Sequence, residues 1–216
     1  MAHGDEQNQT TEAAGNAILS ALIVTCIAIE AALSLSDFGL LPWPRLRYVF
    51  YEYGAFWPGL LQNWRPAFPW QPWTMFLTYG FLHGGLLHLA FNMITLRSLG
   101  RVVIARIGAL GFVAIYVTSM ICGAGVYGML AADNVPMVGA SGALFGLAGA
   151  LVGWAWTAQS DTMASIRATW QLIAFLIGIN LVMYFSFSTG VAWQTHLGGF
   201  VVGWAVALLL DRFDVA

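Results

Sequence analysis

Four polar side chains lie inside long apolar runs of the sequence, and their types could do chemistry together. Ser141 precedes the apolar run 143–156, His196 begins another, and His88 and Asn92 lie four residues apart in a third. A hydroxyl beside an imidazole, close to an amide that can donate a hydrogen bond, contains the parts that acyl transfer requires. The segments that carry these residues must meet for such a site to form.

The segment Gly139-Ala140-Ser141-Gly142 predicts a helix that starts at the serine. Unpaired backbone N–H groups at a helix start favour a developing negative charge, so they would help to bind an oxyanion. A serine at this position is more often a simple N-cap, and that alternative stays open here.

Glycine spacing suggests how Ser141 and His196 could meet. Small residues four apart let two helix backbones approach closely, and such pairs occur in both segments, at Gly142 and Gly146, Gly149 and Gly153, and Gly199 and Gly203. If these faces pack together, the serine and the histidine begin their helices at a similar depth, within hydrogen-bond reach. Phe145, four residues after Ser141, could stack on the histidine ring, although an aromatic at that spacing is more often plain core.

His88 and Asn92 share one helical face, and His83 lies near the preceding loop. Polar residues within a span more often join helices by hydrogen bonds than catalyse. Glu30 lies late in the first apolar run. It is either a partner in a hydrogen-bond network or a residue at the outer end of a span. We favour the outer end because a carboxylate costs less free energy at the interface than within the membrane. Asp133, Asp161, Asp211 and Asp214 lie outside the apolar runs, so we predict a Ser–His dyad without a third acidic member.

Composition indicates the elements that must position these residues. Hydrophobic residues make up 59% of the 216 positions and charged residues 8%, against about 25% in soluble domains. There is no lysine, and the eight arginines are scattered, so nucleic-acid binding is not indicated. The two cysteines fall in apolar runs and do not suggest a disulfide or a zinc site. A bilayer is the expected solvent.

Six spans of suitable length are predicted, at 16–36, 75–96, 103–130, 140–158, 170–187 and 191–210. We therefore expect an all-α polytopic membrane protein with one six-helix domain over residues 16–212. A short polar tail, 1–15, precedes the domain and another, 213–216, follows it. The loop 37–74 holds five of the ten tryptophans, so we expect it to lie in the membrane interface as short amphipathic pieces. An aromatic anchor without a catalytic part is the simpler reading of this loop.

Arginine placement favours cytoplasmic termini. Arg97, Arg101, Arg106, Arg167 and Arg212 fall on one side of a six-span arrangement, and Arg45, Arg47 and Arg65 fall together in the long loop. We expect a multi-pass protein of a bacterial inner (plasma) membrane.

At these residues the chain resembles the rhomboid family of intramembrane serine proteases. The resemblance rests on Gly139-Ala140-Ser141-Gly142, on His196-x-x-Gly199-x-x-x-Gly203 and on His83-x4-His88-x3-Asn92, in family order along the whole core. It implies that Ser141 is the nucleophile and His196 the general base. It also implies oxyanion stabilisation by Asn92, His88 and the Ser141 backbone N–H, and a supporting role for His83. Phe145 stands where the family often has a tyrosine that stacks on the histidine.

The implied activity is a serine endopeptidase that cuts other proteins in or near their transmembrane segments, with small residues at the cut and no cofactor or metal. Substrate would enter beside the fifth helix, near 183–187, with the following loop to Trp193 as a cap. The first rival is an inactive rhomboid-like protein that binds or escorts membrane clients. A metal site of His83, His88 and His196 is a second rival, although the chain lacks a His-Glu-x-x-His pattern. A channel or transporter is a third, although inverted repeats are not visible.

Overall fold

The computed structural model describes residues 2–131, 134–186 and 192–212, and every regular element in this part of the chain is helical. The all-α class predicted from the sequence is therefore confirmed for these residues. The elements in chain order are α1 (Ala2–Asp37), α2 (Leu46–Gly54), the 3₁₀ turn η1 (Pro58–Leu61), α3 (Gln71–Thr78), the 3₁₀ turn η2 (Tyr79–Phe81), α4 (Leu86–Leu130), α5 (Ser141–Thr157), α6 (Thr162–Ser186) and α7 (Trp193–Arg212).

Three helices of the described residues are long and apolar enough to cross a bilayer: Thr10–Asp37 within α1, α4, and α7. Helix α5 is apolar but shorter. Helix α1 begins at Ala2, well before the predicted span. Residues 2–15 contain no proline, and their Ala, Glu and Gln residues are good helix formers, so the helix extends through the polar segment.

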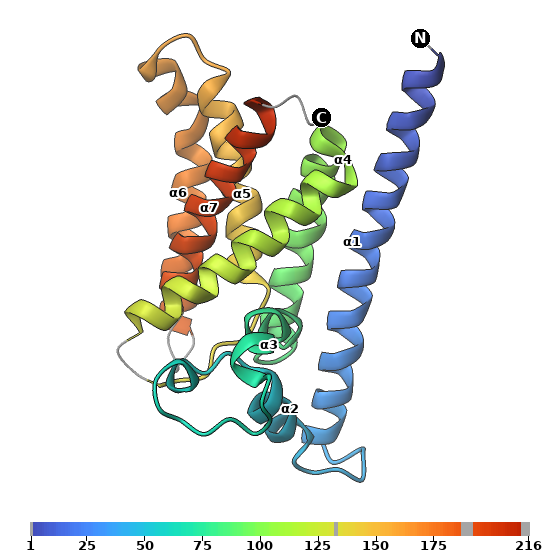
Figure 1. Cartoon of the computed structure of the whole chain (residues 1–216), viewed down its shortest axis with the longest axis vertical. Helices are drawn as coiled ribbons and strands as arrows, with labels where there is room; N and C mark the ends of the chain where they lie inside the picture. Colours follow the sequence, from blue (N-terminus) through green and yellow to red (C-terminus); the bar gives the residue numbers. More distant parts are fainter. Residues whose placement is uncertain (1, 132–133, 187–191, 213–216) are drawn as a thin grey trace.

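Helix α4 is two helical arms joined at Gly108, whose φ of +67° is non-helical. Figure 1 shows one arm rising from α3 to the end of the molecule where α1 begins and α7 ends, and the other descending from there. The prediction placed this break between residues 96 and 103. The first arm continues to Ile107 instead, because one helical face stays buried through that interval, at Leu96, Gly100, Val103, Ile104 and Ile107.

The same arm begins later than predicted, at Leu86 rather than at residue 75. Helix α3 ends at Thr78, η2 follows, and Gly85 with a φ of +115° precedes the new helix. A positive φ is costly for any residue with a β-carbon, so glycine suits this reversal. As a result His83 lies outside the helix and His88 lies in its first turn.

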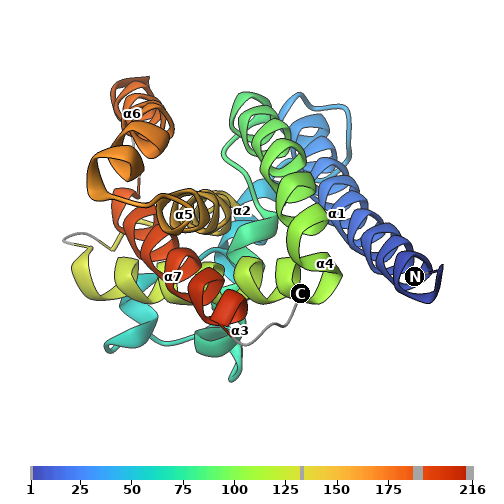
Figure 2. The ribbon, with the colours of Figure 1, turned by 90° about the horizontal axis from the view of Figure 1, so that it is seen from above.

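Helix α5 occupies the middle of the bundle. Most of its residues are buried on every side, as expected for a helix without a polar face. Viewed from above, α5 lies among α6, α7 and the first arm of α4 (Figure 2), and a β-carbon on its Gly146 would collide with Ser119 of the second arm. The contact between α5 and α7 is made of backbone: a β-carbon on Gly199 would collide with the Gly142 carbonyl, and one on Gly203 with the Gly146 carbonyl. The predicted meeting of the two glycine faces is present.

The segment between α1 and α4 folds as short helices at the end of the bundle opposite the start of α1 and the end of α7 (Figure 1). It is tied to the segment that precedes α5, because Phe56 and Met137 exchange both backbone hydrogen bonds, at 3.0 and 2.9 Å. Trp43, Trp70 and Trp73 are largely exposed. This segment therefore reaches across the same end of the molecule where α5 and α7 begin.

Candidate active site

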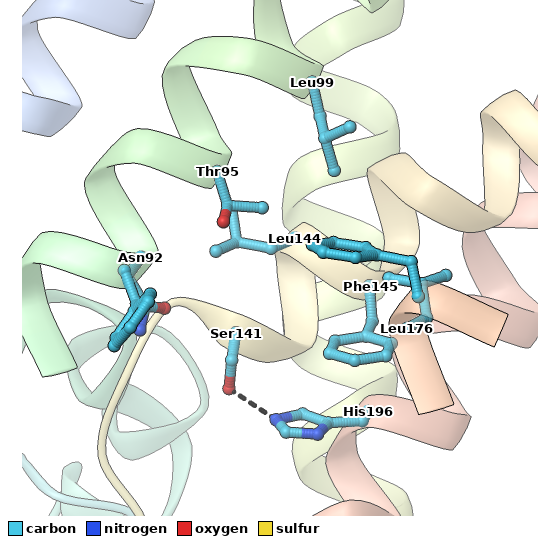
Figure 3. A pocket seen from close by; sticks show the side chains of 10 residues that line it. Asn92, Thr95, Leu99, Ser141, Leu144, Phe145, Leu176 and His196 are labelled. Carbon is cyan, nitrogen blue, oxygen red and sulfur yellow. Dashed lines mark hydrogen bonds between the residues drawn. The ribbon is translucent and has the colours of Figure 1, made fainter. Parts of the chain in front are cut away.

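Ser141 and His196 lie in contact at the starts of α5 and α7. Ser141 is the first residue of α5, Ala140 precedes it as the cap residue, and no side chain caps this helix. The Ser141 hydroxyl oxygen instead lies 2.8 Å from Nε2 of His196, as Figure 3 shows. The hydroxyl can donate to this nitrogen when the imidazole is neutral. The N-cap alternative for Ser141 is therefore wrong.

Phe145 and His196 are stacked face to face. Their ring centroids are 4.3 Å apart and the rings are within 5° of parallel. Phe145 lies one helical turn after Ser141, so a single face of α5 presents both the hydroxyl and the ring. Because His196 is 6% exposed and lies between these groups, its ring has little freedom to turn away from the serine.

The turn before Ser141 is fixed by backbone geometry at Gly139. This residue has a φ of +120°, and its N–H donates to the Tyr79 carbonyl at 3.0 Å. A β-carbon at Gly139 would lie 2.9 Å from Nε2 of His88. Glycine is needed here for both the conformation and the close approach of the histidine ring.

His88 and Asn92 lie on the α4 side of Ser141. The Asn92 side-chain amide donates to the His88 carbonyl at 2.9 Å, which leaves its second N–H for another acceptor. Figure 3 shows Asn92 on one side of Ser141 and His196 on the other. Asn92 and His196 thus lie on opposite sides of Ser141, and Nε2 of His88 lies beside Gly139, two residues before the serine.

The backbone N–H of Gly84 determines the protonation pattern of His88. It donates to Nδ1 of His88 at 3.1 Å, so this nitrogen must carry a lone pair. In a neutral imidazole the proton then resides on Nε2, the nitrogen near Gly139. His88 is therefore oriented as a hydrogen-bond donor toward the start of α5.

His83 is fully buried before α4, and its ring meets that of His88 edge to face, with centroids 5.3 Å apart. Its side chain contacts the site through His88. Its carbonyl oxygen has two donors, Tyr51 Oη at 2.8 Å and Arg47 Nη1 at 3.0 Å.

An apolar pocket opens from the dyad between the first arm of α4 and α6. Ser141, His196 and Asn92 form its polar end (Figure 3), and the other lining residues are Phe91, Thr95, Leu99, Leu144, Phe145, Phe175 and Leu176. The pocket has the character of a site for an apolar segment that brings one polar bond to the serine. The predicted entrance at 183–187 and the cap before Trp193 lie outside the residues whose side chains are described.

Glu30 is a partner in a hydrogen-bond network, which is the alternative that the sequence reasoning did not favour. Its side chain is fully buried and pairs with Arg47, with a shortest separation of 2.7 Å. Arg47 also bonds Asp37 at 2.6 Å, so it joins α1 to α2. A carboxylate buried within a helix needs a partner to compensate for lost hydration, and the long loop supplied one.

The sequence reasoning missed Arg47 and Tyr51. Burial opposes the charged form of Arg47, but hydrogen bonds to Glu30 and Asp37 outweigh it and raise the pKa of the guanidinium, so it stays charged. Burial raises the pKa of Tyr51, which keeps its hydroxyl as a donor. The signal that could have found Arg47 was Glu30 itself, an acidic residue at membrane depth that required a cation.

Two of the aspartates outside the apolar runs, Asp161 and Asp211, have structural partners. Asp161 caps α6 through the Ala164 N–H, at 2.9 Å, and Asp211 pairs with Arg106 at 3.3 Å. Asp133 and Asp214 lie outside the described residues. Over 2–131, 134–186 and 192–212 no group of three His, Cys, Asp or Glu residues is arranged to hold a metal ion.

Comparisons with known proteins show which family the chain belongs to. The model of the rhomboid domain matches residues 69–213, more than half of the chain. Rhomboid protease GluP of Bacillus subtilis is 36% identical over 141 residues, which are 64% of this chain and 26% of that protein.

Two eukaryotic relatives match over nearly the same length. RHOMBOID-like protein 4 of Arabidopsis thaliana is 30% identical over 143 residues, 65% of this chain and 34% of that protein. Rhomboid-type serine protease 2 of Emericella nidulans is 29% identical over 143 residues, 65% of this chain and 27% of that protein. The chain thus matches about a quarter to a third of the length of these relatives. With its apolar helices and the family model spanning most of the bundle, the chain is an integral membrane protein that belongs to the rhomboid family.

Proposed function

We propose that this chain is an intramembrane serine endopeptidase that uses a Ser141–His196 dyad. The observation that carries the proposal is the 2.8 Å contact between Ser141 Oγ and His196 Nε2 at the start of a buried helix. A serine hydroxyl is a weak nucleophile on its own and requires a base within hydrogen-bond reach. The imidazole is held at that distance by the stack with Phe145.

In the acylation step His196 takes the Ser141 proton as the hydroxyl oxygen attacks the carbonyl carbon of the scissile bond. The tetrahedral intermediate carries its negative charge on the former carbonyl oxygen. It collapses when the C–N bond breaks and His196 returns the proton to the leaving amine. In deacylation His196 takes a proton from a water molecule as the water oxygen attacks the acyl carbonyl. The ester bond to Ser141 then breaks, and His196 returns the proton to the Ser141 oxygen.

Three donors support stabilisation of the oxyanion. The Ser141 backbone N–H belongs to the first turn of α5, where N–H groups have no partner within the helix. The second N–H of the Asn92 amide and the Nε2 proton of His88 come from α4. Fixed donors of this kind are the largest contribution in many acyl-transfer enzymes, and losing one costs about 100-fold or more in kcat.

The proposed substrate is a transmembrane segment of another protein, cut at or near the bilayer. The pocket between α4 and α6 is apolar over most of its lining, which suits such a segment. A helical substrate must unwind there, because its backbone groups are otherwise bonded within the helix. Small residues at the cut fit the approach to a serine enclosed by α4, α5 and α7.

We place six spans in the membrane, namely α1, the two arms of α4, α5, α6 and α7, as one domain over residues 16–212. The segment 37–74 then lies at the interface. Helix α1 begins and helix α7 ends at the same end of the bundle (Figure 1). Positive residues favour the cytoplasmic side, and Arg106 and Arg212 lie in the helix ends there, so both termini are cytoplasmic in this proposal.

The test is cleavage of a transmembrane peptide by the purified chain in detergent and in liposomes. Ser141→Ala and His196→Ala should each abolish turnover, while Ser98→Ala should leave it unchanged. Ser98 is a matched control because it is an exposed serine of α4 whose hydroxyl bonds its own helix at Ile94. Equal cleavage by the wild type and by Ser141→Ala would overturn the assignment.

Reactivity gives a second measure that does not need the right substrate. A fluorophosphonate should label Ser141 in the wild type and in Ser98→Ala, and should fail to label His196→Ala. If the labelled residue is another serine, the proposed nucleophile is wrong.

A further inference from the structure

One peptide group connects the charged junction between α1 and α2 to the proposed oxyanion site. It is the amide between His83 and Gly84. Its carbonyl oxygen accepts from Arg47 at 3.0 Å and from Tyr51 at 2.8 Å. Its N–H, on Gly84, donates to Nδ1 of His88 at 3.1 Å. The same planar unit therefore receives hydrogen bonds on one side and gives one on the other.

Two physical effects follow from that arrangement. Hydrogen bonds in a chain polarise one another, so donors on the carbonyl oxygen strengthen the N–H on the far side of the amide. The peptide plane is also rigid, so fixing the carbonyl oxygen fixes the direction of the N–H. Arg47 is charged, and bonds from charged donors are about twice as strong as neutral ones.

Arg47 is itself held by carboxylates. Two of its nitrogens bond the two oxygens of Glu30, at 3.0 and 2.7 Å, and Nε bonds Asp37 at 2.6 Å. Glu30 is fully buried and receives a further bond from Ser34, at 2.9 Å. The carboxylates of α1 thus orient the guanidinium that donates to the His83 carbonyl.

We propose that Arg47, held by Glu30 and assisted by Tyr51, is a positioning residue that fixes His88 in its Nε2-protonated form through the His83–Gly84 peptide. The proton on Nε2 is then always directed toward the start of α5, near Gly139. The inference rests on the proposed function for its catalytic consequence, since His88 acts there as an oxyanion donor. The effect on the imidazole itself does not depend on any activity.

The first measurement is the protonation of His88 by ¹⁵N-detected imidazole spectra, with the signal assigned by its loss in His88→Gln. The wild type should show a single form with hydrogen on Nε2. Glu30→Gln removes the charge of the carboxylate but keeps an oxygen that can hold Arg47, so the spectrum should change little. Glu30→Gln/Arg47→Met leaves no buried charge behind and removes the donor, so a share of His88 should move to the Nδ1-protonated form.

Kinetics provide the second measurement. The double variant should lose at least about tenfold in kcat with little change in KM, less than the roughly 100-fold cost of deleting an oxyanion donor outright. Tyr51→Phe keeps the ion pair and removes the second donor to His83, so it should produce the same changes to a smaller extent. It also keeps the test decisive if the double variant does not fold. Arg106→Gln, which breaks the Arg106–Asp211 pair elsewhere, should change neither measure.

The outcomes separate this inference from the proposed function. If the double variant and Tyr51→Phe keep the wild-type His88 spectrum and kcat, Arg47 does not position His88 and the inference is overturned. If the wild type cleaves nothing but the variants still shift the His88 spectrum, the peptide link stands and the protease proposal fails. A loss of thermal stability without a change in the spectrum would mean that the ion pair is merely structural, and would also overturn the inference.

Discussion

Two junctions hold the candidate site, and they are built on opposite principles. The junction of α5 with α7 contains no charge: glycines bring backbone against backbone, and Ser141 and His196 meet at its end. The junction of α1 with α2 is an ion pair buried beside the bundle, and it ends at the His83 carbonyl. The α5–α7 junction positions the proposed nucleophile and base. The α1–α2 junction is connected to the proposed oxyanion donor His88 through the His83–Gly84 peptide.

The difference shows how each kind of contact limits motion. A glycine contact leaves no room for a side chain, so any added atom separates two rigid helices. Ser141 and His196, at the starts of these helices, would then move apart as well. A hydrogen-bonded ion pair works by direction, because a planar guanidinium bonds several acceptors in a fixed geometry. Changes at the first junction should therefore affect the dyad severely, and changes at the second should affect it mildly.

The largest effect is expected from Gly199→Ala. The new methyl group would collide with the Gly142 carbonyl, so α5 and α7 must separate at the depth of the dyad. A displacement of about 1 Å costs on the order of 100-fold in rate, and overpacking costs about 1–3 kcal/mol in stability. Peptide cleavage and thermal unfolding in detergent measure both. Gly125→Ala is the matched control, since a β-carbon there meets nothing within 4 Å; if the two variants behave alike, the exclusion argument fails.

The next effect is expected from Glu30→Leu at the charged junction. Arg47 loses its buried partner, so we expect a stability loss somewhat below the about 3–5 kcal/mol typical of fully buried pairs, because the Arg47 side chain is 22% exposed. Cleavage should fall about tenfold as the oxyanion donor loses its orientation. Glu30→Leu/Arg47→Met should recover thermal stability without recovering cleavage. Recovery of both would show that this junction is only structural.

A smaller effect is expected from Phe145→Leu, which keeps apolar volume but removes the aromatic stack on His196. Such a stack contributes about 0.5–1.5 kcal/mol beyond its buried area, so cleavage should fall about two- to tenfold. Phe145→Tyr keeps the ring and should remain near wild type. If leucine and tyrosine give the same rate, the ring does not orient the imidazole.

The smallest effect is expected at Arg106. This residue pairs with Asp211 at 3.3 Å and lies 4.5 Å above the Trp154 ring, with half of its side chain exposed. Exposed pairs contribute about 0–1 kcal/mol, so Arg106→Gln should lower the midpoint of thermal unfolding slightly and leave cleavage unchanged. A large loss of cleavage would mean that ion pairs far from the site also control it, and the contrast between the two junctions would weaken.

Much of this molecule could be read from local patterns in the sequence. Low charge and long apolar runs predicted helices in a bilayer, because exposed apolar surface of that extent is unfavourable in water. Glycine every fourth residue predicted the α5–α7 contact, since the spacing places the glycines on one helical face. Ser141 and His196, each at the start of its segment, were expected to meet, and the structure brings them together.

Other features followed from contacts that the sequence does not display. The break in α4 lies at Gly108 rather than between residues 96 and 103, because the buried face continues through Ile107 and long arginine side chains can reach polar surroundings from within a helix. Its position in the sequence favoured an interfacial Glu30, but in the folded chain Arg47 of α2 pairs with this carboxylate. Sequence separation hid that pair.

The sequence by itself determined which groups could react and which helices could touch, because residue type and helical period are local properties. Only the tertiary structure decided how the side chains of the candidate site are oriented. The Gly84 N–H donates to Nδ1 of His88, the carbonyl of the same peptide accepts from Arg47, 36 residues earlier in the chain, and the start of α5 lies beside Tyr79 and His88. The orientation of a side chain at the site depends on contacts with segments that are distant in the sequence. Only the folded chain brings those segments together.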